Sequence, residues 1–353
     1  MRPIELAPNQ PRQFYRGGSV IAAFRGGTAK DDHRPEDWIG STTHRNGTAG
    51  EEGLTTLPDG RLLRDAVRTD PEAWLGAAHA AAIGADPALL VKLLDVGERL
   101  PVHVHPGRPF AKRHLGCRYG KTEAWVVLEA PGAEPRVHVG FTRDVEAAEL
   151  DRWTATQDTR AMLASLHAVA VGPGDTVLVP AGMPHAIGAG ILCLELQEPT
   201  DFSVMLEWES YSQLDAGEAR LGLDAELARE CVHRRALSPA RLRWLRSHGS
   251  RVSSSGEGVE RLFPEDADAF FRAERIRSER APVRLAPGFA ILVVLAGRGQ
   301  LDSDGETTRA LQRGSAVLIP HAAGETTVSG PLVAVRCRPP SVQAALADGL
   351  ELA

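Results

Sequence analysis

The sequence has 353 residues, of which 43% are hydrophobic and 24% are charged, and its formal net charge is −6. A chain of this length can hold two domains, because domains commonly contain about 100 to 200 residues. It contains no apolar stretch of the roughly 18 residues that a membrane span needs, no secretory signal and no long run of basic residues. These features exclude a membrane-spanning protein, disfavour nucleic acid as a partner and predict a cytoplasmic location.

The predicted helices are local. Asp70 is followed by Pro71 and the run EAWLGAAHAAAI, a pattern typical of an N-cap with proline at the first helical position. A second helical candidate runs from Asp144 to Leu166. A third candidate, polar and rich in arginine, covers residues 214–247.

Short apolar runs bounded by Gly and Pro predict strands. In chain order they read RVHVGF, DTVLVP, ILCLELQ, VRLAPG, FAILVVLAG, SAVLIP and PLVAVRC. Many short strands separated by Gly and Pro turns are typical of a β-sandwich or a barrel. We therefore expect a mainly β protein.

Two of these runs form a weak internal repeat. Residues 174–180 read GDTVLVP and residues 314–320 read GSAVLIP, and a histidine follows each, at His185 and His321. The repeat predicts two related barrels, with the small polar segment 250–258 as a loop between them. We expect an N-terminal barrel with helical segments over residues 1–213, a helical connector over 214–258 and a C-terminal barrel over 259–353.

A histidine cluster in the first repeat predicts a metal site. His103 and His105 are two residues apart, so on a strand both imidazoles project from the same face and can share one cation. His185 follows a Pro-Ala-Gly turn that sets the next strand in register, and it is a candidate third ligand. No His-x-His pair precedes His321 within the C-terminal half, so we expect no metal in the second barrel. The four cysteines lie far apart without a CxxC pair, which argues against a thiolate zinc site.

These motifs resemble those of a known family. Gly97, with five residues between it and His103-Val104-His105, and Gly174 with the later PAGxxH segment, resemble the two motifs of the cupin superfamily. The segment GKTE at 120–123, directly before an apolar strand, narrows the resemblance to type I mannose-6-phosphate isomerases. WIGS at 38–41, LVKLLD at 90–95 and GILCLELQ at 190–197 also match segments of that family.

The resemblance implies a fold, a cofactor and a reaction. The fold would be two cupin (jelly-roll) barrels with short helices at the N-terminus and between the barrels. One divalent metal, zinc in the family, would be held by His103 in place of the family's glutamine, together with His105, Glu123 and His185. This set of three histidines and one glutamate also suits Mn, Fe or Ni.

The implied activity is aldose–ketose isomerisation of mannose 6-phosphate or a related sugar through an enediolate. The proton could be moved by Lys121, by Glu195 or by a water on the metal, and the sequence leaves these three open. Trp38, Ser41 and Gln197 are the further candidates for substrate contacts.

One segment departs from the family. Val204 and Ser210 stand where bacterial members carry two arginines that contact the substrate. Either a loop arginine, such as Arg113 or Arg118, substitutes for them, or the substrate is not a typical sugar 6-phosphate. A cupin metalloenzyme of other chemistry and a non-catalytic, metal-binding sugar sensor are the alternative functions. The expected partner is a small-molecule sugar or sugar phosphate. The sequence does not indicate how many copies of the chain associate.

Overall fold

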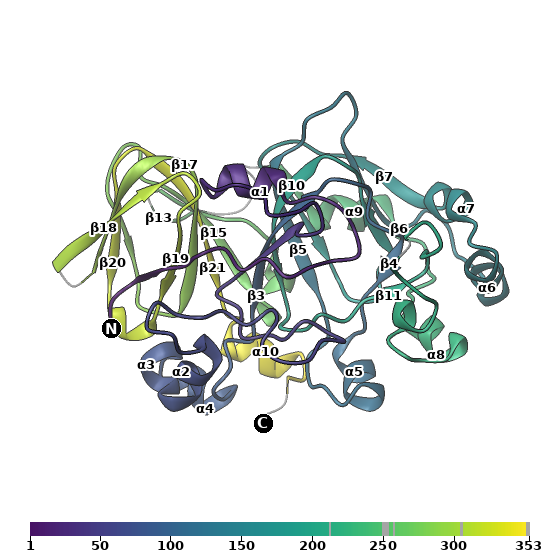
Figure 1. The fold of residues 1–353 in the computed structure, drawn as a ribbon, viewed down its shortest axis with the longest axis horizontal. Coiled ribbons are helices and arrows are strands. Elements are labelled where there is room, and N and C mark those ends of the chain that lie inside the picture. Colours follow the sequence, from purple (N-terminus) through teal and green to yellow (C-terminus); the bar gives the residue numbers. More distant parts are fainter. Residues whose placement is uncertain (212, 249–253, 257, 304–305, 351–353) are drawn as a thin grey trace.

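A computed structural model describes residues 1–211, 213–248, 254–256, 258–303 and 306–350. These residues form a mainly β structure of several antiparallel sheets with short helices at its margins (Figure 1). The prediction of a mainly β protein is confirmed. In the described part of the chain, no helix is long and apolar enough to cross a membrane.

The first sheet lies at the centre of the molecule and has six strands among the described residues. Its order is β12 (Arg246–His248), β8 (Asp175–Val179), β5 (Glu123–Glu129), β10 (Ile191–Gln197), β3 (Leu90–Val96) and β2 (Glu36–Ile39). Along β10 the leucines face one side, and Cys193, Glu195 and Gln197 alternate with them, as the sequence pattern predicts.

The second sheet packs against one face of the first. Its described strands run in the order β11 (Val204–Met205), β4 (His103–Val104), β9 (His185–Ile187), β6 (Arg136–Phe141) and β7 (Leu166–Ala170). Apolar side chains from both sheets, including Trp125, Val139 and Ile187, fill the space between them. This packing fixes the strands that carry the predicted metal ligands.

The third sheet is built mostly from the C-terminal third of the chain. Its described strands are β1 (Ile4–Glu5), β19 (Ala316–Ile319), β17 (Ala290–Ser303), β21 (Leu332–Arg338), β15 (Arg272–Arg277), β14 (Val259–Arg261) and β13 (Ser254–Gly256), with β16 (Val283–Leu285), β18 (Glu306–Gln312) and β20 (Thr326–Ser329) branching from this path. The strand β1 pairs with β19, so residues from both ends of the sequence contribute strands to the third sheet.

One apolar core joins the first and third sheets. It contains Leu194 and Val91 of the first sheet together with Val293 and Val335 of the third, and each of them is at most 1% exposed. Burying one such aliphatic side chain contributes about 1.5–3 kcal/mol to the stability of the folded protein. The two β-rich regions therefore support each other through a shared core.

The helices are shorter than the sequence pattern predicts. Asp70 accepts a hydrogen bond from the Ala73 amide at 3.1 Å and caps α3 (Pro71–Leu75) as expected. The predicted helix is then broken at Gly76, whose φ of +88° is left-handed, and continues as α4 (Ala77–Ala82). A side chain at this glycine would also meet the ring of His321 at 2.9 Å.

The two later helical predictions are wrong in their extent. Residues 144–166 form α6 (Ala147–Ala155) and α7 (Thr159–Ala164), and Gln157 between them has a φ of +48°. In place of one helix over 214–247, the described residues form η1 (Glu218–Arg220), α8 (Ala225–Glu230) and α9 (Pro239–Leu245), because two successive positive-φ residues at 221–222 and Pro239 interrupt it. Of the predicted loop 250–258, residues 250–253 and 257 lie outside the described residues, and 254–256 form strand β13.

The remaining short helices lie at the margins of the sheets (Figure 1). They are α1 (Ser19–Phe24), α2 (Leu63–Thr69), α5 (Arg108–His114) and α10 (Val342–Ala347), with the 3₁₀ turns η2 (Glu265–Ala269) and η3 (His321–Ala323).

Candidate functional site

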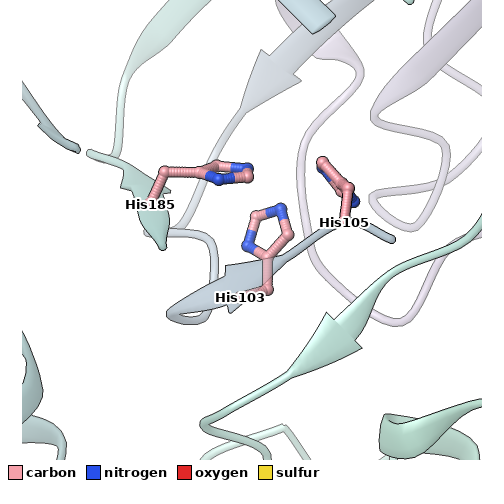
Figure 2. Close-up of side chains that lie close together, drawn as sticks. All are labelled: His103, His105 and His185. Carbon is pink, nitrogen blue, oxygen red and sulfur yellow. The ribbon is translucent and has the colours of Figure 1, made fainter. Parts of the chain in front are cut away.

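Three buried histidines converge between the first and second sheets. In the antiparallel pairing of β4 with β9, His103 lies opposite His185, and His105 follows two residues after His103 (Figure 2). One ring nitrogen from each of the three histidines lies within 4.8 Å of the other two. The structure therefore brings together the three histidines that the sequence predicts as metal ligands.

The turn before His185 is held tightly. Gly182 has a φ of +83°, and a Cβ atom there would lie 2.7 Å from the ring of His233. The Gly182 amide donates a hydrogen bond to the His105 carbonyl at 2.8 Å. This glycine thus permits the turn and ties it to the strand that carries the other two imidazoles.

Backbone carbonyl groups fix the orientation of all three rings. The Nδ1 atoms of His103, His105 and His185 lie 2.8 Å from the carbonyl oxygens of Pro101, Phe202 and Met183. A carbonyl oxygen only accepts, so each Nδ1 carries the proton and donates it, and each neutral ring keeps a lone pair on Nε2. This arrangement is the usual one for metal-ligating histidines.

Glu123 completes the cluster at the start of β5. Its Oε2 lies 2.9 Å from Nε2 of His105, and its Oε1 lies 3.3 Å from Nε2 of His185. Burial would raise the pKa of Glu123, but the neighbouring His105 and Lys121 outweigh burial and hold that pKa well below its usual range. Burial and the charge of Lys121 lower the pKa of His105 to about 3, so that ring is neutral near pH 7.

The cluster therefore has the donor set of a cation site. Nε2 of His105 and Oε2 of Glu123 are both acceptors, both are buried, and in the described structure the one donor near them is the Lys121 ammonium, 3.3 Å from Oε2. Nε2 of His185 is also buried without a hydrogen-bond partner. A divalent metal between these lone pairs would satisfy all of them, so the residues present fit such a metal.

Two further titratable groups line the same cavity. The Lys121 ammonium lies 3.3 Å from Oε2 of Glu123. Glu195, on β10, accepts a hydrogen bond from Nε1 of Trp125 at 3.3 Å, while its Oε2 is buried without a hydrogen-bond partner in the described structure. Burial and the charge of Glu123 raise the pKa of Glu195 to about 8. Both residues predicted as catalytic therefore lie beside the metal cluster.

The cavity has a volume of about 780 Å³, which lies in the usual range for small-molecule sites. Its wall combines the cluster residues His103 and Glu123, the titratable groups Lys121 and Glu195, and residues of loops. The lining loop residues include Gln13, Arg45, Asn46, Gly47 and Asp215.

Lys92 is a residue of this cavity that the sequence analysis does not single out for a role. Its ammonium lies 3.1 Å from Glu36 and 3.6 Å from Asp201, and it stacks 4.5 Å over the ring of Trp38. Burial would lower the pKa of Lys92, but Glu36 and Asp201 outweigh burial and raise it. The signals that could have found it are the scarcity of lysine in the chain and its place in the LVKLLD segment.

The five residues predicted as substrate contacts lie elsewhere. None of them is among the described residues that line the cavity. Nε1 of Trp38 donates to Glu36 at 2.6 Å, the Ser41 hydroxyl to the Thr43 carbonyl at 3.2 Å, and the Gln197 amide to the Thr200 carbonyl at 2.5 Å. Arg118 donates to the Ile83 carbonyl at 2.9 Å and Arg113 lies on α5. Their substrate contacts stay predictions.

Val204, which the sequence resemblance aligns with a family arginine, is a core residue. It is 1% exposed and pairs with Val104 between β11 and β4. An arginine with this orientation would bury its charge among apolar side chains, so the local packing explains why the position is apolar.

A buried ion pair positions the GKTE segment. The Glu198 carboxylate accepts hydrogen bonds from Nε of Arg108 at 2.7 Å and from the Thr122 amide at 2.9 Å. Arg108 also donates to the Ala269 carbonyl at 2.8 Å, which links the site to the C-terminal region. Glu198 therefore fixes the backbone between Lys121 and Glu123, and nothing in its sequence context indicates this role.

We expect Glu198→Leu to lower the free energy of unfolding by about 3 kcal/mol, because it leaves the buried Arg108 charge with only the exposed Asp348, 3.0 Å away, as its acidic partner among the described residues. Chemical denaturation measures this change. The double variant Glu198→Leu/Arg108→Met should recover part of the loss, since it removes both charges. Equal stability of the Glu198→Leu variant and the unchanged protein would contradict this account of the ion pair.

Two sequence relatives of this chain are both named mannose-6-phosphate isomerase. No family model matches the chain. The mannose-6-phosphate isomerase ManA of Bacillus subtilis is 28% identical over 252 residues, which cover 69% of this chain and 72% of that protein. The mannose-6-phosphate isomerase of Streptococcus mutans is 37% identical over 113 residues, which cover 32% of this chain and 34% of that protein.

Solved structures show the same fold over nearly the whole chain. The mannose 6-phosphate isomerase of Bacillus subtilis superposes with a TM-score of 0.74 at 22% identity and covers 96% of this chain and 100% of that one. The apo form of the Salmonella typhimurium enzyme of the same name gives a TM-score of 0.71 at 16% identity, with 97% and 100% coverage. Together with the sequence relatives, this shows that the chain is similar over most of its length to mannose-6-phosphate isomerases.

Proposed function

We propose that the chain is a metal-dependent aldose–ketose isomerase that acts on mannose 6-phosphate or a related sugar. The observation that carries the proposal is the cluster of His103, His105, His185 and Glu123, which shares one cavity with Lys121 and Glu195. The names of the sequence relatives support the same reaction and the same substrate class.

The cofactor in this proposal is one divalent metal, and zinc is the ion that we expect. His103, His105, His185 and Glu123 would hold it through three Nε2 atoms and a carboxylate. Such a donor set is compatible with Zn and also with Mn, Fe or Ni. When bound, the metal supplies Lewis-acid stabilisation of negative charge that develops on a substrate oxygen.

Two side chains of the cavity, Glu195 and Lys121, would carry out the rest of the reaction. Isomerisation moves a proton between C1 and C2 of the sugar, and the transition state carries negative charge on oxygen. We assign proton transfer to Glu195, because it lines the same cavity as the cluster and its buried Oε2 has no hydrogen-bond partner in the described structure, with the Lys92 ammonium 3.9 Å away. The Lys121 ammonium then stabilises the negative oxygen electrostatically.

The three sheets can be grouped into two barrels. We propose that the first and second sheets form one cupin barrel and that the third sheet forms another, without metal. The proposed division is residues 1–213, 214–258 and 259–353. The repeated Gly-strand-Pro segments, which become β8 and β19, support this arrangement.

Elemental analysis of the purified protein, followed by an isomerase assay, tests the function in one preparation. We expect one equivalent of divalent metal per chain and conversion of mannose 6-phosphate to the corresponding ketose phosphate. Treatment with a chelator should remove both the metal and the activity, and adding zinc back should restore them. A fully metallated protein that converts neither mannose 6-phosphate nor free mannose would contradict the proposal.

A further inference from the structure

The cavity needs a group that can bind the anionic end of a phosphorylated sugar. The family arginines are absent at Val204 and Ser210, and Val204 is sealed in the core. Among the described residues that line the cavity, the positive side chains are Arg45, Lys92 and Lys121, with Arg45 as the one arginine. Lys121 lies beside the metal cluster and Lys92 lies among the three carboxylates of Glu36, Glu195 and Asp201, so Arg45 is the cation left for this task.

The backbone of Arg45 is held in place at the cavity wall. Its amide donates to the Glu52 carbonyl at 2.9 Å, and its carbonyl accepts from the Thr48 hydroxyl at 2.8 Å. The next amide, that of Asn46, donates to Asp201 at 3.1 Å, and Asp201 in turn lies 3.6 Å from the Lys92 ammonium. These contacts tie the Arg45 loop to the inner wall of the cavity.

The guanidinium group itself is held weakly. Nε of Arg45 lies 3.4 Å from Oε1 of Gln13, and Nη1 lies 3.9 Å from Oε2 of Glu52. Both contacts are long for charge-assisted hydrogen bonds, which are usually about 2.7–2.9 Å. The side chains of Arg45 and Glu52 are 25% and 35% exposed, so this pair is screened by water. An incoming dianion would therefore compete easily with Glu52.

The inner carboxylates Glu36, Asp201 and Glu123 do not offset this charge, because each has its own partner, and Glu195 lies 3.9 Å from the Lys92 ammonium. Glu36 accepts from the Tyr15 hydroxyl at 2.8 Å and from Lys92 at 3.1 Å, and Asp201 accepts from the Asn46 amide. Glu123 lies within the metal cluster. A loosely held guanidinium, flanked by the amide side chains of Gln13 and Asn46 on the cavity wall, has the donors that bind a phosphate group.

We propose that Arg45 binds the phosphate group of a phosphorylated aldose and so supplies the anion contact that the residues at 204 and 210 do not. This inference rests on the proposed function, since it names the group that recognises the substrate of the same site. It also replaces Arg113 and Arg118 as the loop arginine with this task, because neither lines the described cavity.

Steady-state kinetics of Arg45→Gln on mannose 6-phosphate and on free mannose test the proposal. A charge-assisted contact to phosphate is worth about tenfold to a hundredfold in affinity. We expect KM for mannose 6-phosphate to rise by about that factor while KM for free mannose stays within about twofold. Arg45→Lys keeps the charge but loses the two parallel N–H donors of the guanidinium group. Its KM for mannose 6-phosphate should lie between those of the unchanged protein and Arg45→Gln. Arg61→Gln is the matched control, since Arg61 pairs with Asp59 on the surface and lies outside the cavity lining.

Calorimetric binding of mannitol 6-phosphate separates this inference from the proposed function, because this polyol phosphate has no carbonyl group and cannot be isomerised. Arg45→Gln should weaken its binding by about tenfold or more and leave the weak binding of mannitol unchanged. This loss would support the inference even if the protein isomerised no sugar. Equal affinity of Arg45→Gln and the unchanged protein for mannitol 6-phosphate would overturn it, and so would equal losses for the phosphorylated and the free ligand.

Discussion

Replacing His105 with alanine should remove the bound metal and abolish isomerase activity. His105 contributes one of the converging ring nitrogens, and its Nε2 faces Glu123 at 2.9 Å. Loss of this ligand leaves three donors and opens a gap in a fully buried cluster. Lewis-acid stabilisation is worth several kcal/mol in the transition state, so kcat should fall by about a thousandfold or more. Elemental analysis and the mannose 6-phosphate assay measure the two effects on the same sample.

His321→Ala is the matched control for this experiment. His321 begins the turn η3 in the C-terminal region, close to Gly76 and outside the histidine cluster. The variant should keep one equivalent of metal and unchanged activity. Retention of a full equivalent of metal by His105→Ala would contradict the assigned ligand set. Loss of metal from His321→Ala would contradict the prediction that the C-terminal region binds none.

The convergence of the histidines is predictable because it depends on local geometry. A strand places residues i and i+2 on one face, so the spacing of His103 and His105 is enough to bring their rings together. The same period explains why Glu195 faces away from the leucines of β10. The strands themselves are predictable because short apolar runs end at Gly and Pro.

The predicted long helices are broken into shorter ones, because the backbone conformation of a single residue can end a helix in a segment whose composition favours helix. Gly76 and Gln157 each adopt a positive φ that ends a helix within an otherwise suitable stretch. Helix propensity is a weak prior when several short segments pack against sheets, since tertiary contacts then decide where each helix stops.

The contacts that support the site cannot be predicted from the sequence, because they join segments that lie far apart in the chain. Glu198 reaches Arg108 across 90 positions, and Asp201 reaches Asn46 across 155. No local pattern marks such partners, although they fix both the GKTE backbone and the loop of Arg45. The same reason explains why Arg113 and Arg118 are the loop arginines that the sequence suggests, whereas the fold brings Arg45 to the cavity.

Glu195→Gln should lower kcat by about a hundredfold to ten-thousandfold without removing the metal. The amide keeps the size of the side chain and its contact with Trp125 but cannot accept a proton as a base, and proton transfer by a positioned group is worth about that factor. Glu195 is not a member of the histidine cluster, so the metal content should stay at one equivalent per chain. Glu129→Gln is the matched control, since Glu129 ends strand β5 in an ion pair with Arg313 outside the cavity lining.

Chemical rescue then separates the base from the electrostatic partner. In Glu195→Ala, the cavity of about 780 Å³ leaves room for a small carboxylate, and added formate should restore part of kcat in proportion to its concentration. Lys121→Met should also lower kcat, but formate should not rescue it, because that variant lacks a positive charge and keeps its base. If formate rescued Lys121→Met and not Glu195→Ala, or if Glu195→Gln kept more than about a tenth of kcat, the proton would have to be moved by a group other than Glu195. Lys121 is then the next candidate, because its ammonium lines the same cavity and lies 3.3 Å from Glu123 of the cluster.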